Sequence, residues 1–148
     1  MIGRVREEDL PDLLPLMRAY CDFYEVAPSD EGLLGLSRAL LADPLSEGVQ
    51  LLARDDETGG ATGFATVFWT WSTLNASRIA VMNDLFVDPA ARGTGLADAL
   101  IDASRAEART NGAVWLGWQT AKDNHRAQKV YDRVGGERSE WIDYGLRP

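Results

Sequence analysis

Three apolar stretches follow one another between residues 49 and 87, and helical patterns stand on both sides of them in the chain. The stretches are "VQLLAR" at 49–54, "TGFATVFW" at 62–69 and "RIAVMNDLFV" at 78–87. The turn "DDETGGA" joins the first two into a predicted hairpin. The third stretch is mostly apolar, as expected for a strand that is covered on both faces. The chain therefore predicts a central sheet with helices on both sides.

The other elements follow from the spacing of apolar and capping residues. Helices are expected from residue 10 to about 24 and, after an N-cap at Ser29, up to Asp43-Pro44. Further helices are expected from the glycine run at 92–95 to about 111, and over 123–136. Short strands are expected at 2–5, 113–119 and 139–146. The expected fold is one α/β (α+β) domain over residues 1–148, with a mixed, mostly antiparallel sheet of about six or seven strands and about four helices.

Composition excludes several classes of function. The 15 Lys and Arg residues against 23 Asp and Glu residues give a net charge of −8, which argues against nucleic-acid binding and suits a cationic partner. No apolar run approaches the roughly 20 residues that span a bilayer, and the acidic N-terminus lacks a signal-peptide core. The single cysteine, Cys21, excludes an internal disulfide and a multi-cysteine metal site. We therefore expect no membrane partner, no metal and a reducing, cytoplasmic location.

The run Arg92, Gly93, Thr94, Gly95 stands where a helix that begins with Leu96 and Ala97 should start. Glycine is a poor helix former, so helix stability does not explain it. Unpaired N–H groups and the positive end of a helix dipole attract phosphate, and small residues allow close approach. A tight strand-to-helix turn is the alternative interpretation. The run fits neither a P-loop, which needs Gly-Lys before Ser or Thr, nor the dinucleotide fingerprint, because Asp98 takes its last position.

The run also carries a family resemblance. "RGTGLA" resembles the acyl-CoA signature of the GNAT N-acetyltransferase superfamily, Arg/Gln-x-x-Gly-x-Gly/Ala, which follows the fourth strand in that family, as here. A second family signature, Asn-x-x-Ala-x-x-x-Tyr-x-x-x-Gly, is met by Asn124, Ala127, Tyr131 and Gly135. The resemblance covers essentially the whole chain and implies a single GNAT-like domain.

Three segments are similar to the spermidine/spermine (diamine) N-acetyltransferase branch, namely "GFATVFWTWST", "NDLFVDPAARGTGLADAL" and "YDRVGGERSEW". That branch usually carries two adjacent acids on the fourth strand, whereas this chain has Asn83 before Asp84. The branch also suggests a homodimer, and the aromatic edge "FWTWST" at 68–73 gives this expectation physical support.

The resemblance implies acetyl-CoA as the co-substrate. Its pyrophosphate would lie on the amides of the glycine run, and its pantetheine arm would pair with strand backbone, as an added strand would. The residues expected to bind it are Leu85, Phe86, Val87, Arg92, Gly93, Thr94, Gly95, Leu96, Ala97, Asn124 and Ala127.

Two residues are predicted to be catalytic. Tyr131 lies on an apolar helical stripe, where a core aromatic is the alternative, but the family tyrosine protonates the departing CoA thiolate. A phenol with a reference pKa of about 10 can donate at neutral pH. Alternation along the strand places Asp84 on one face with Met82 and Phe86, where a carboxylate is costly without a partner. A substrate amine would supply one, with Asp84 acting either as base or as anchor.

The expected acceptor is small and cationic, because aromatic side chains beside acids suit an amine. A surface or dimer-interface position is the alternative for several of these residues. The residues expected to contact the acceptor are Tyr24, Glu25, Asn83, Asp84, Trp118, Gln119 and Glu140.

The sequence therefore predicts an N-acetyltransferase that moves an acetyl group from acetyl-CoA to a primary amine of a polyamine or lysine-like molecule. Direct attack in a ternary complex is expected. Protein, peptide and aminoglycoside acceptors are alternatives within the same class. A non-catalytic acyl-CoA-binding module is the alternative from another class.

Overall fold

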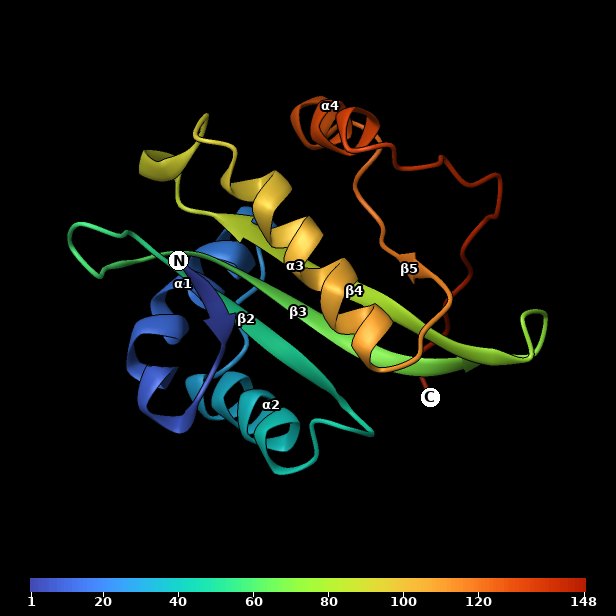
Figure 1. Cartoon of the computed structure of the whole chain (residues 1–148), viewed down its shortest axis with the longest axis horizontal. Coiled ribbons are helices and arrows are strands. Elements are labelled where there is room, and N and C mark those ends of the chain that lie inside the picture. Colours follow the sequence, from blue (N-terminus) through green and yellow to red (C-terminus); the bar gives the residue numbers. More distant parts are fainter.

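The computed structural model describes all 148 residues and contains one sheet of five strands in the order β1-β2-β3-β4-β5 (Figure 1). The first four strands are antiparallel neighbours, and β5 pairs with β4 in parallel. This confirms the predicted mixed, mostly antiparallel sheet. The strands are β1 (Ile2–Arg4), β2 (Gly48–Arg54), β3 (Ala61–Ser72), β4 (Ser77–Val87) and β5 (Leu116–Gly117).

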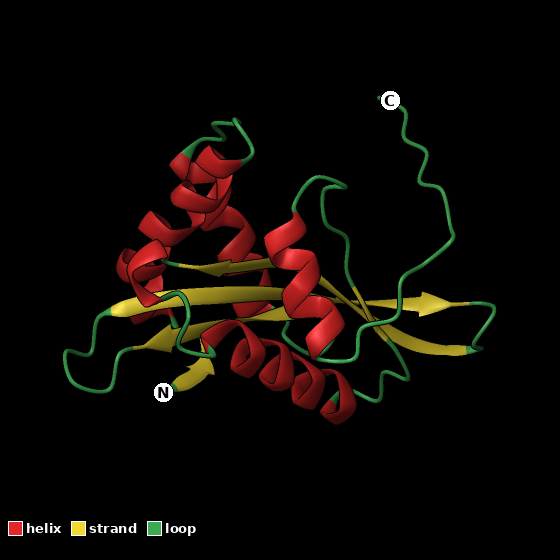
Figure 2. Ribbon diagram, turned by 90° about the horizontal axis from the view of Figure 1, so that it is seen from above, coloured by secondary structure: helices red, strands yellow, loops and turns green.

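Of the four α-helices, α1 and α2 cover one face of the sheet and α3 covers the other (Figure 2). Local signals set their ends: the Ser29 hydroxyl accepts from the Gly32 N–H at 3.1 Å and caps α2, and Gly112 ends α3 with a φ of 80°. The helices are α1 (Leu10–Phe23), α2 (Asp30–Ala42), α3 (Leu96–Thr110) and α4 (His125–Arg133), with short 3-10 turns at Glu7–Asp9 and Pro89–Ala91.

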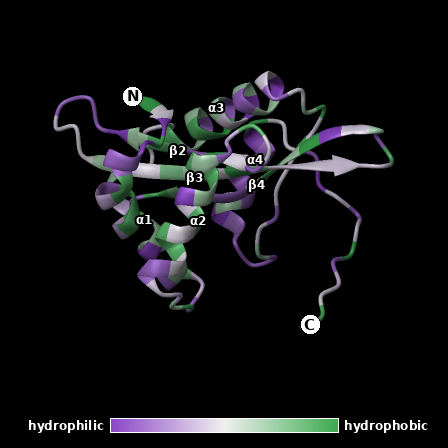
Figure 3. Ribbon diagram, turned by 90° about the horizontal axis from the view of Figure 1, so that it is seen from below, coloured by the Kyte–Doolittle hydropathy of each residue, from purple (hydrophilic) through white to green (hydrophobic).

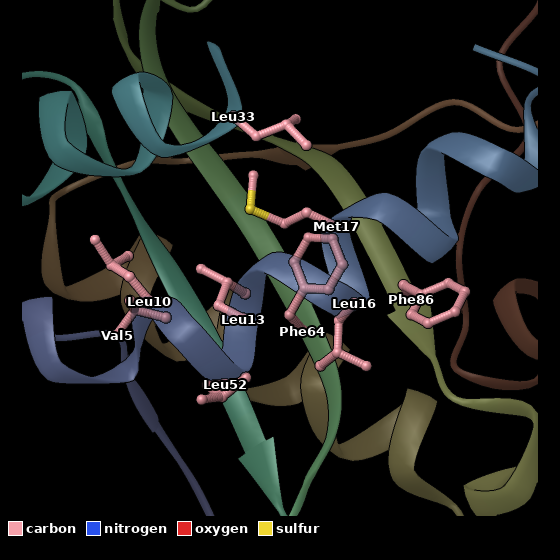
Figure 4. Close-up of a cluster of buried hydrophobic side chains, with 9 residues drawn as sticks. All are labelled: Val5, Leu10, Leu13, Leu16, Met17, Leu33, Leu52, Phe64 and Phe86. Atoms are coloured by element: carbon pink, nitrogen blue, oxygen red, sulfur yellow. The ribbon is translucent and has the colours of Figure 1, made fainter. Parts of the chain in front are cut away.

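The core on the α1 side is a cluster of nine buried side chains (Figure 4). Leu13, Leu16 and Met17 of α1 contact Phe64 of β3 and Phe86 of β4. Leu10, Leu13 and Met17, whose spacing predicts this helix, are all buried in the cluster, so the apolar spacing and the packing agree.

The core on the α3 side has two clusters under one face of that helix. Leu100, Ile101 and Ala108 are buried there against Val67 and Leu51 of the sheet. Hydrophilic and hydrophobic residues alternate along α3 in Figure 3, as expected for a helix with one buried face.

The register of β4 against β3 shifts by one residue at Asn83. Thr66 lies opposite Asp84 and Val67 lies opposite Met82, so Asn83 is the extra residue of a β-bulge. Because one extra residue changes the face, Asp84 lies with Phe86 under α1, whereas Met82 packs with Ile101 on the α3 side. The expectation that Asp84 shares a face with both Met82 and Phe86 is therefore wrong for Met82.

The predicted strand at 139–146 does not form, and the predicted strand at 113–119 is limited to Leu116–Gly117. Parallel pairing with β4 ends at Val81, after which the two segments diverge. The C-terminal segment, defined as residues 137–148, then runs away from the sheet (Figures 2 and 3). Residues 139–146 pair with none of the strands, so the sheet has five strands and not six or seven.

Candidate active site

A cavity of about 640 Å³ opens beside the unpaired part of β4. Because β5 leaves β4 after Val81, the β4 edge over residues 85–87 has no strand beside it and faces the cavity. The end of α1, the glycine run with the start of α3, and one face of α4 complete the walls. The cavity therefore lies where free strand backbone meets a helix N-terminus.

The two glycines of the run have left-handed backbone conformations, with φ of 80° at Gly93 and 84° at Gly95. A β-carbon on either glycine would meet no protein atom within 4 Å. The turn itself therefore requires glycine, and the space in front of it is open. Both interpretations of the run, a tight turn and a close approach for a ligand, are compatible with this geometry.

The start of α3 has free donors. Gly95 is its N-cap and no side chain caps it, so first-turn N–H groups are left without intrahelical partners beside the cavity-lining residues Leu96 and Ala97. Thr94 does not line the cavity, because its hydroxyl turns back and donates to the Ala91 carbonyl oxygen at 2.8 Å. Such a helix end favours a bound phosphate.

Basic side chains surround this end of the cavity. Arg92 donates from Nε to the Val87 carbonyl oxygen at 3.1 Å, while burial and the neighbouring charge of Arg126 lower the pKa of Arg92. Lys129 of α4 also lines the cavity, and Arg133 does so while bound to Asp98. A polyanion would relieve the repulsion between these cations.

Helix α4 carries the second predicted signature along the cavity. Asn124 caps the helix, with Oδ1 accepting from the Ala127 N–H at 3.2 Å. Tyr131 stands further along the same wall, and its ring packs edge-to-face on Trp118 with 5.4 Å between centroids. Burial, with a smaller contribution from Tyr24, raises the pKa of Tyr131 to about 12. The phenol is therefore protonated at neutral pH and can donate a proton.

Asp84 is buried behind the cavity wall, with 9% of its surface exposed. The Asn83 amide donates to its carboxylate at 3.0 Å, and the hydroxyls of Thr66 and Tyr20 also face it. Burial raises the pKa of Asp84, and the Thr66 and Tyr20 hydroxyls and the Asn83 amide near the carboxylate oppose that rise because they favour the ionised form. No Lys, Arg or His forms an ion pair with it.

The structure brings together most of the predicted site residues and leaves some outside. The cavity wall includes Tyr131 and Tyr24. Asn83 and Trp118 contact wall residues, since the Asn83 carbonyl oxygen accepts from the Tyr20 hydroxyl and the Trp118 ring packs on Tyr131. Three others do not reach it: Glu25 is exposed after the end of α1, Gln119 binds Asp143, and Glu140 is exposed in the C-terminal segment. The predicted CoA-binding residues that line the cavity are Leu85, Phe86, Val87, Arg92, Gly93, Gly95, Leu96, Ala97, Asn124 and Ala127.

Tyr20, Phe23, Arg126 and Lys129 are among the lining residues that were not expected from the sequence. Tyr20 and Phe23 sit on a helix whose apolar stripe is typical of core packing, so the sequence gives no separate signal for them. Arg126 and Lys129 lie within the second signature, and their positive charge close to a phosphate-binding motif could have indicated a role in binding.

Nowhere do three or more His, Cys, Asp or Glu side chains come together as metal ligands. No helix combines the length and apolar character needed to cross a membrane.

The fold and this cavity define an acetyl-CoA-dependent acetyltransferase. Residues 13–136 match the Acetyltransferase (GNAT) family, and the chain belongs to that family. It is 34% identical over 136 residues to the uncharacterized N-acetyltransferase YhfO of Bacillus subtilis (strain 168), covering 92% of this chain and 89% of that one. It is 35% identical over 96 residues to the D-amino-acid N-acetyltransferase HPA3 of Saccharomyces cerevisiae, covering 65% and 60%.

Solved structures agree with this assignment. A probable acetyltransferase superposes with a TM-score of 0.87 at 32% identity, over 100% of this chain and 97% of that one. The aminoglycoside N-acetyltransferase AAC(6')-Iy, solved in complex with CoA, superposes with a TM-score of 0.86 over 99% and 93% of the two chains. At 21% identity, the second likeness concerns the fold alone.

Proposed function

We propose that this acetyltransferase acts on a primary amine of a small cationic acceptor, a polyamine or a lysine-like compound. The observation that carries the proposal is the separation of charge in the cavity. Its four cationic lining residues, Arg92, Arg126, Lys129 and Arg133, all belong to the glycine run or α4. The α1 wall contributes only aromatic side chains, and the Asp84 carboxylate lies behind them.

The α1 end suits an ammonium group. Tyr20, Phe23 and Tyr24 form a continuous aromatic wall with centroids 5.1 Å apart between successive edge-to-face pairs. Aromatic faces attract cations, and a buried carboxylate without an ion-pair partner gains one from an ammonium group. A net charge of −8 also favours the approach of a cation.

The opposite end fits acetyl-CoA. The residues there offer helix N–H donors, guanidinium and ammonium groups for phosphates, and strand backbone along Leu85–Val87 for an extended amide-containing arm. When bound there, acetyl-CoA supplies the activated acetyl group. A strand amide at Leu85 or Phe86 is the proposed donor to the oxygen that develops negative charge.

Two side chains perform the proton transfers in this proposal. Tyr131 gives its proton to the departing sulfur. Asp84 binds the incoming ammonium group and accepts its proton either directly or through water. Deprotonating an amine of pKa near 10.4 at pH 7 costs roughly 4–5 kcal/mol, so a carboxylate whose pKa is raised by burial is a better base here than an ordinary one.

The names of the relatives suggest a second candidate, an amino acid acceptor, because HPA3 is a D-amino-acid N-acetyltransferase. That acceptor carries a carboxylate, which needs a cationic partner near the amine. The α1 wall offers none, so the structure favours an acceptor without a carboxylate beside its reacting amine.

The test follows thiol release from acetyl-CoA with spermidine, a diamine, lysine, thialysine, a D-amino acid, an aminoglycoside and a peptide amine. We expect turnover with the polyamine and the side-chain amines of lysine-like compounds. Turnover only with D-amino acids or aminoglycosides would overturn the proposed acceptor. Tight binding of CoA with no turnover across the panel would support a binding module instead.

We also propose that the chain forms a homodimer in the cytoplasm. Its lone cysteine suits a reducing compartment. The C-terminal segment exposes 82% of Trp141 and 94% of Tyr144, and Trp71 is exposed on the long β3–β4 hairpin. Exposed apolar groups of this size mark protein contacts. Light scattering should give the mass of a dimer, and a chain ending at residue 136 should be monomeric.

A further inference from the structure

A row of three buried polar side chains crosses the sheet beneath α1. Gln50, Thr66 and Asp84 lie on adjacent strands and are direct partners in the register, Gln50 opposite Thr66 and Thr66 opposite Asp84. They are 4%, 0% and 9% exposed. Alternation from Phe86 places Asp84 in this row, and the bulge at Asn83 turns Met82 to the other face.

The hydrogen bond within the row is directed from Gln50 to Thr66. Gln50 donates from Nε2 to the Thr66 hydroxyl oxygen at 3.1 Å. A hydroxyl has one hydrogen and two acceptor sites, so Thr66, which accepts from Gln50, has its own hydrogen free to turn to the Asp84 carboxylate opposite it in the register. The row therefore presents a donor to the carboxylate from the side opposite the cavity.

Packing alone does not explain this row. The adjacent row on the same face is made of Leu52, Phe64 and Phe86, which belong to the α1 core. A valine in place of Thr66 would fill the same volume without a polar group to satisfy. The Gln50 amide oxygen is buried and makes no hydrogen bond within the chain, a cost that a glutamine kept only for packing would not justify.

We infer that Thr66 and Gln50 are positioning residues that hold Asp84 oriented and ionised for the amine, an inference that rests on the proposed function. Thr66 acts directly on the carboxylate, and Gln50 acts through Thr66. The titratable groups that face Asp84 otherwise are Tyr20 and Cys21 of α1, both neutral at working pH because burial and the Asp84 charge raise the pKa of each. Neither supplies a positive charge, so the hydrogen bonds are the means of stabilising the ionised form.

The decisive variant is Thr66→Val, which keeps the shape and removes the hydroxyl; Thr66→Ser restores it. Carboxyl-carbon NMR titration of Asp84 should show its pKa higher by about one unit in Thr66→Val and close to wild type in Thr66→Ser. Gln50→Met should raise the pKa by a smaller amount. The double variant should resemble Thr66→Val alone, because Gln50 acts only through the hydroxyl.

In Thr66→Val, the acid limb of the plot of kcat/KM against pH for the preferred amine should move to higher pH by the same amount. At a pH within that limb, kcat/KM should therefore fall about tenfold. An unchanged Asp84 titration in Thr66→Val, with only a lower melting temperature, would show a purely structural role and overturn the inference. If the Asp84 pKa shifts of the two single variants add up in the double variant, Gln50 does not act through Thr66, and that part of the inference is wrong. The titration needs no turnover, so failure of the proposed acetyl transfer is seen separately, in the amine panel.

Discussion

The Tyr131 ring meets Trp118 edge-to-face, with 5.4 Å between the ring centroids and 66° between the ring planes. Trp118 follows β5 and Tyr131 belongs to α4, so this contact joins the segment after β5 to the helix that forms one wall of the cavity. It fixes where the phenol can point. The chemistry proposed for Tyr131 therefore depends on packing behind the cavity as well as on its own hydroxyl.

Replacing Tyr131 with Phe removes the proton donor and keeps the ring against Trp118. We expect kcat to fall by about 100-fold or more, with the affinity for CoA unchanged within about twofold. Calorimetry with CoA and thiol release measure the two effects. Tyr144→Phe is the matched control, because Tyr144 is exposed in the C-terminal segment. A kcat within threefold of wild type would mean that another group protonates the thiolate.

A substitution at Gly136, which lies next to both Tyr131 and Trp118, tests the same contact. A β-carbon there would stand 2.9 Å from the Tyr131 carbonyl oxygen and 3.2 Å from the Trp118 ring. Gly136→Ala should therefore push α4 away from Trp118, lower the free energy of unfolding by about 1–3 kcal/mol and reduce kcat. Gly145→Ala is the control, since nothing lies within 4 Å of its added carbon. Equal melting temperatures for the two variants would contradict the proposed strain.

The sequence predicts the fold correctly where an apolar stretch or a helical stripe extends over many residues. The three apolar stretches over 49–87 and the stripe of α3 define β2, β3, β4 and one covering helix, and the structure confirms them. The bulge could not be predicted, because a single extra residue at Asn83 leaves no mark on an apolar run. The alternating segment at 139–146 was misleading, since pairing depends on a partner edge that a sequence does not display.

The candidate site could likewise be predicted only in part from the sequence. Residues of the two signatures could be placed beside the cavity, because each motif is local and fixes a turn or a helix face. Tyr20 and Thr66 could not, because each looks like an ordinary core residue along its own element. The pairing of β3 with β4 brings Thr66 beside Asp84, and the crossing of α1 over these strands brings Tyr20 there. Residues that act across elements are therefore the ones that local patterns miss.

The buried carboxylate predicts a pH dependence of stability. Burial raises the folded-state pKa of Asp84 above its ordinary value of 3.8. The folded state then binds this proton more tightly than the unfolded state does. The contribution of protonated Asp84 to the free energy of unfolding is therefore fully present below pH 3.8 and is lost as the pH rises through the folded-state pKa. Asp84→Asn should be inactive or nearly so, and its melting temperature relative to wild type should increase from pH 3.5 to pH 7.

Melting curves at intervals of half a pH unit measure this difference. Asp102→Asn is the control for net charge alone, since Asp102 is exposed on α3 beside Arg105. A difference between Asp84→Asn and wild type that stays constant over the whole range would show that Asp84 titrates alike in both states.

The basic side chains of α4 should act on acetyl-CoA and leave the amine unaffected. Removing Arg126 and Lys129 together takes two cations from the cavity wall. We expect the KM for acetyl-CoA to rise by about tenfold to 100-fold, with a weaker dependence on salt and an unchanged KM for the amine. Arg105→Ala, on the exposed side of α3, is the control. A larger effect on the amine KM would place the acceptor at this end of the cavity.

The glycine run gives the sharpest separation of stability from binding. Gly95 and Gly112 have nearly the same left-handed φ, 84° and 80°, and an added β-carbon meets no protein atom within 4 Å at either position. Alanine at either site should therefore lower the free energy of unfolding by a similar amount, about 1–2 kcal/mol.

Only Gly95 lines the cavity, at the opposite end of α3 from Gly112. Gly95→Ala should raise the KM for acetyl-CoA about tenfold, because its methyl group stands where a phosphate would meet the helix N–H groups, and Gly112→Ala should leave it unchanged. Denaturant titrations and initial rates measure the two quantities, and an equal KM in both variants would mean that the run serves the turn alone.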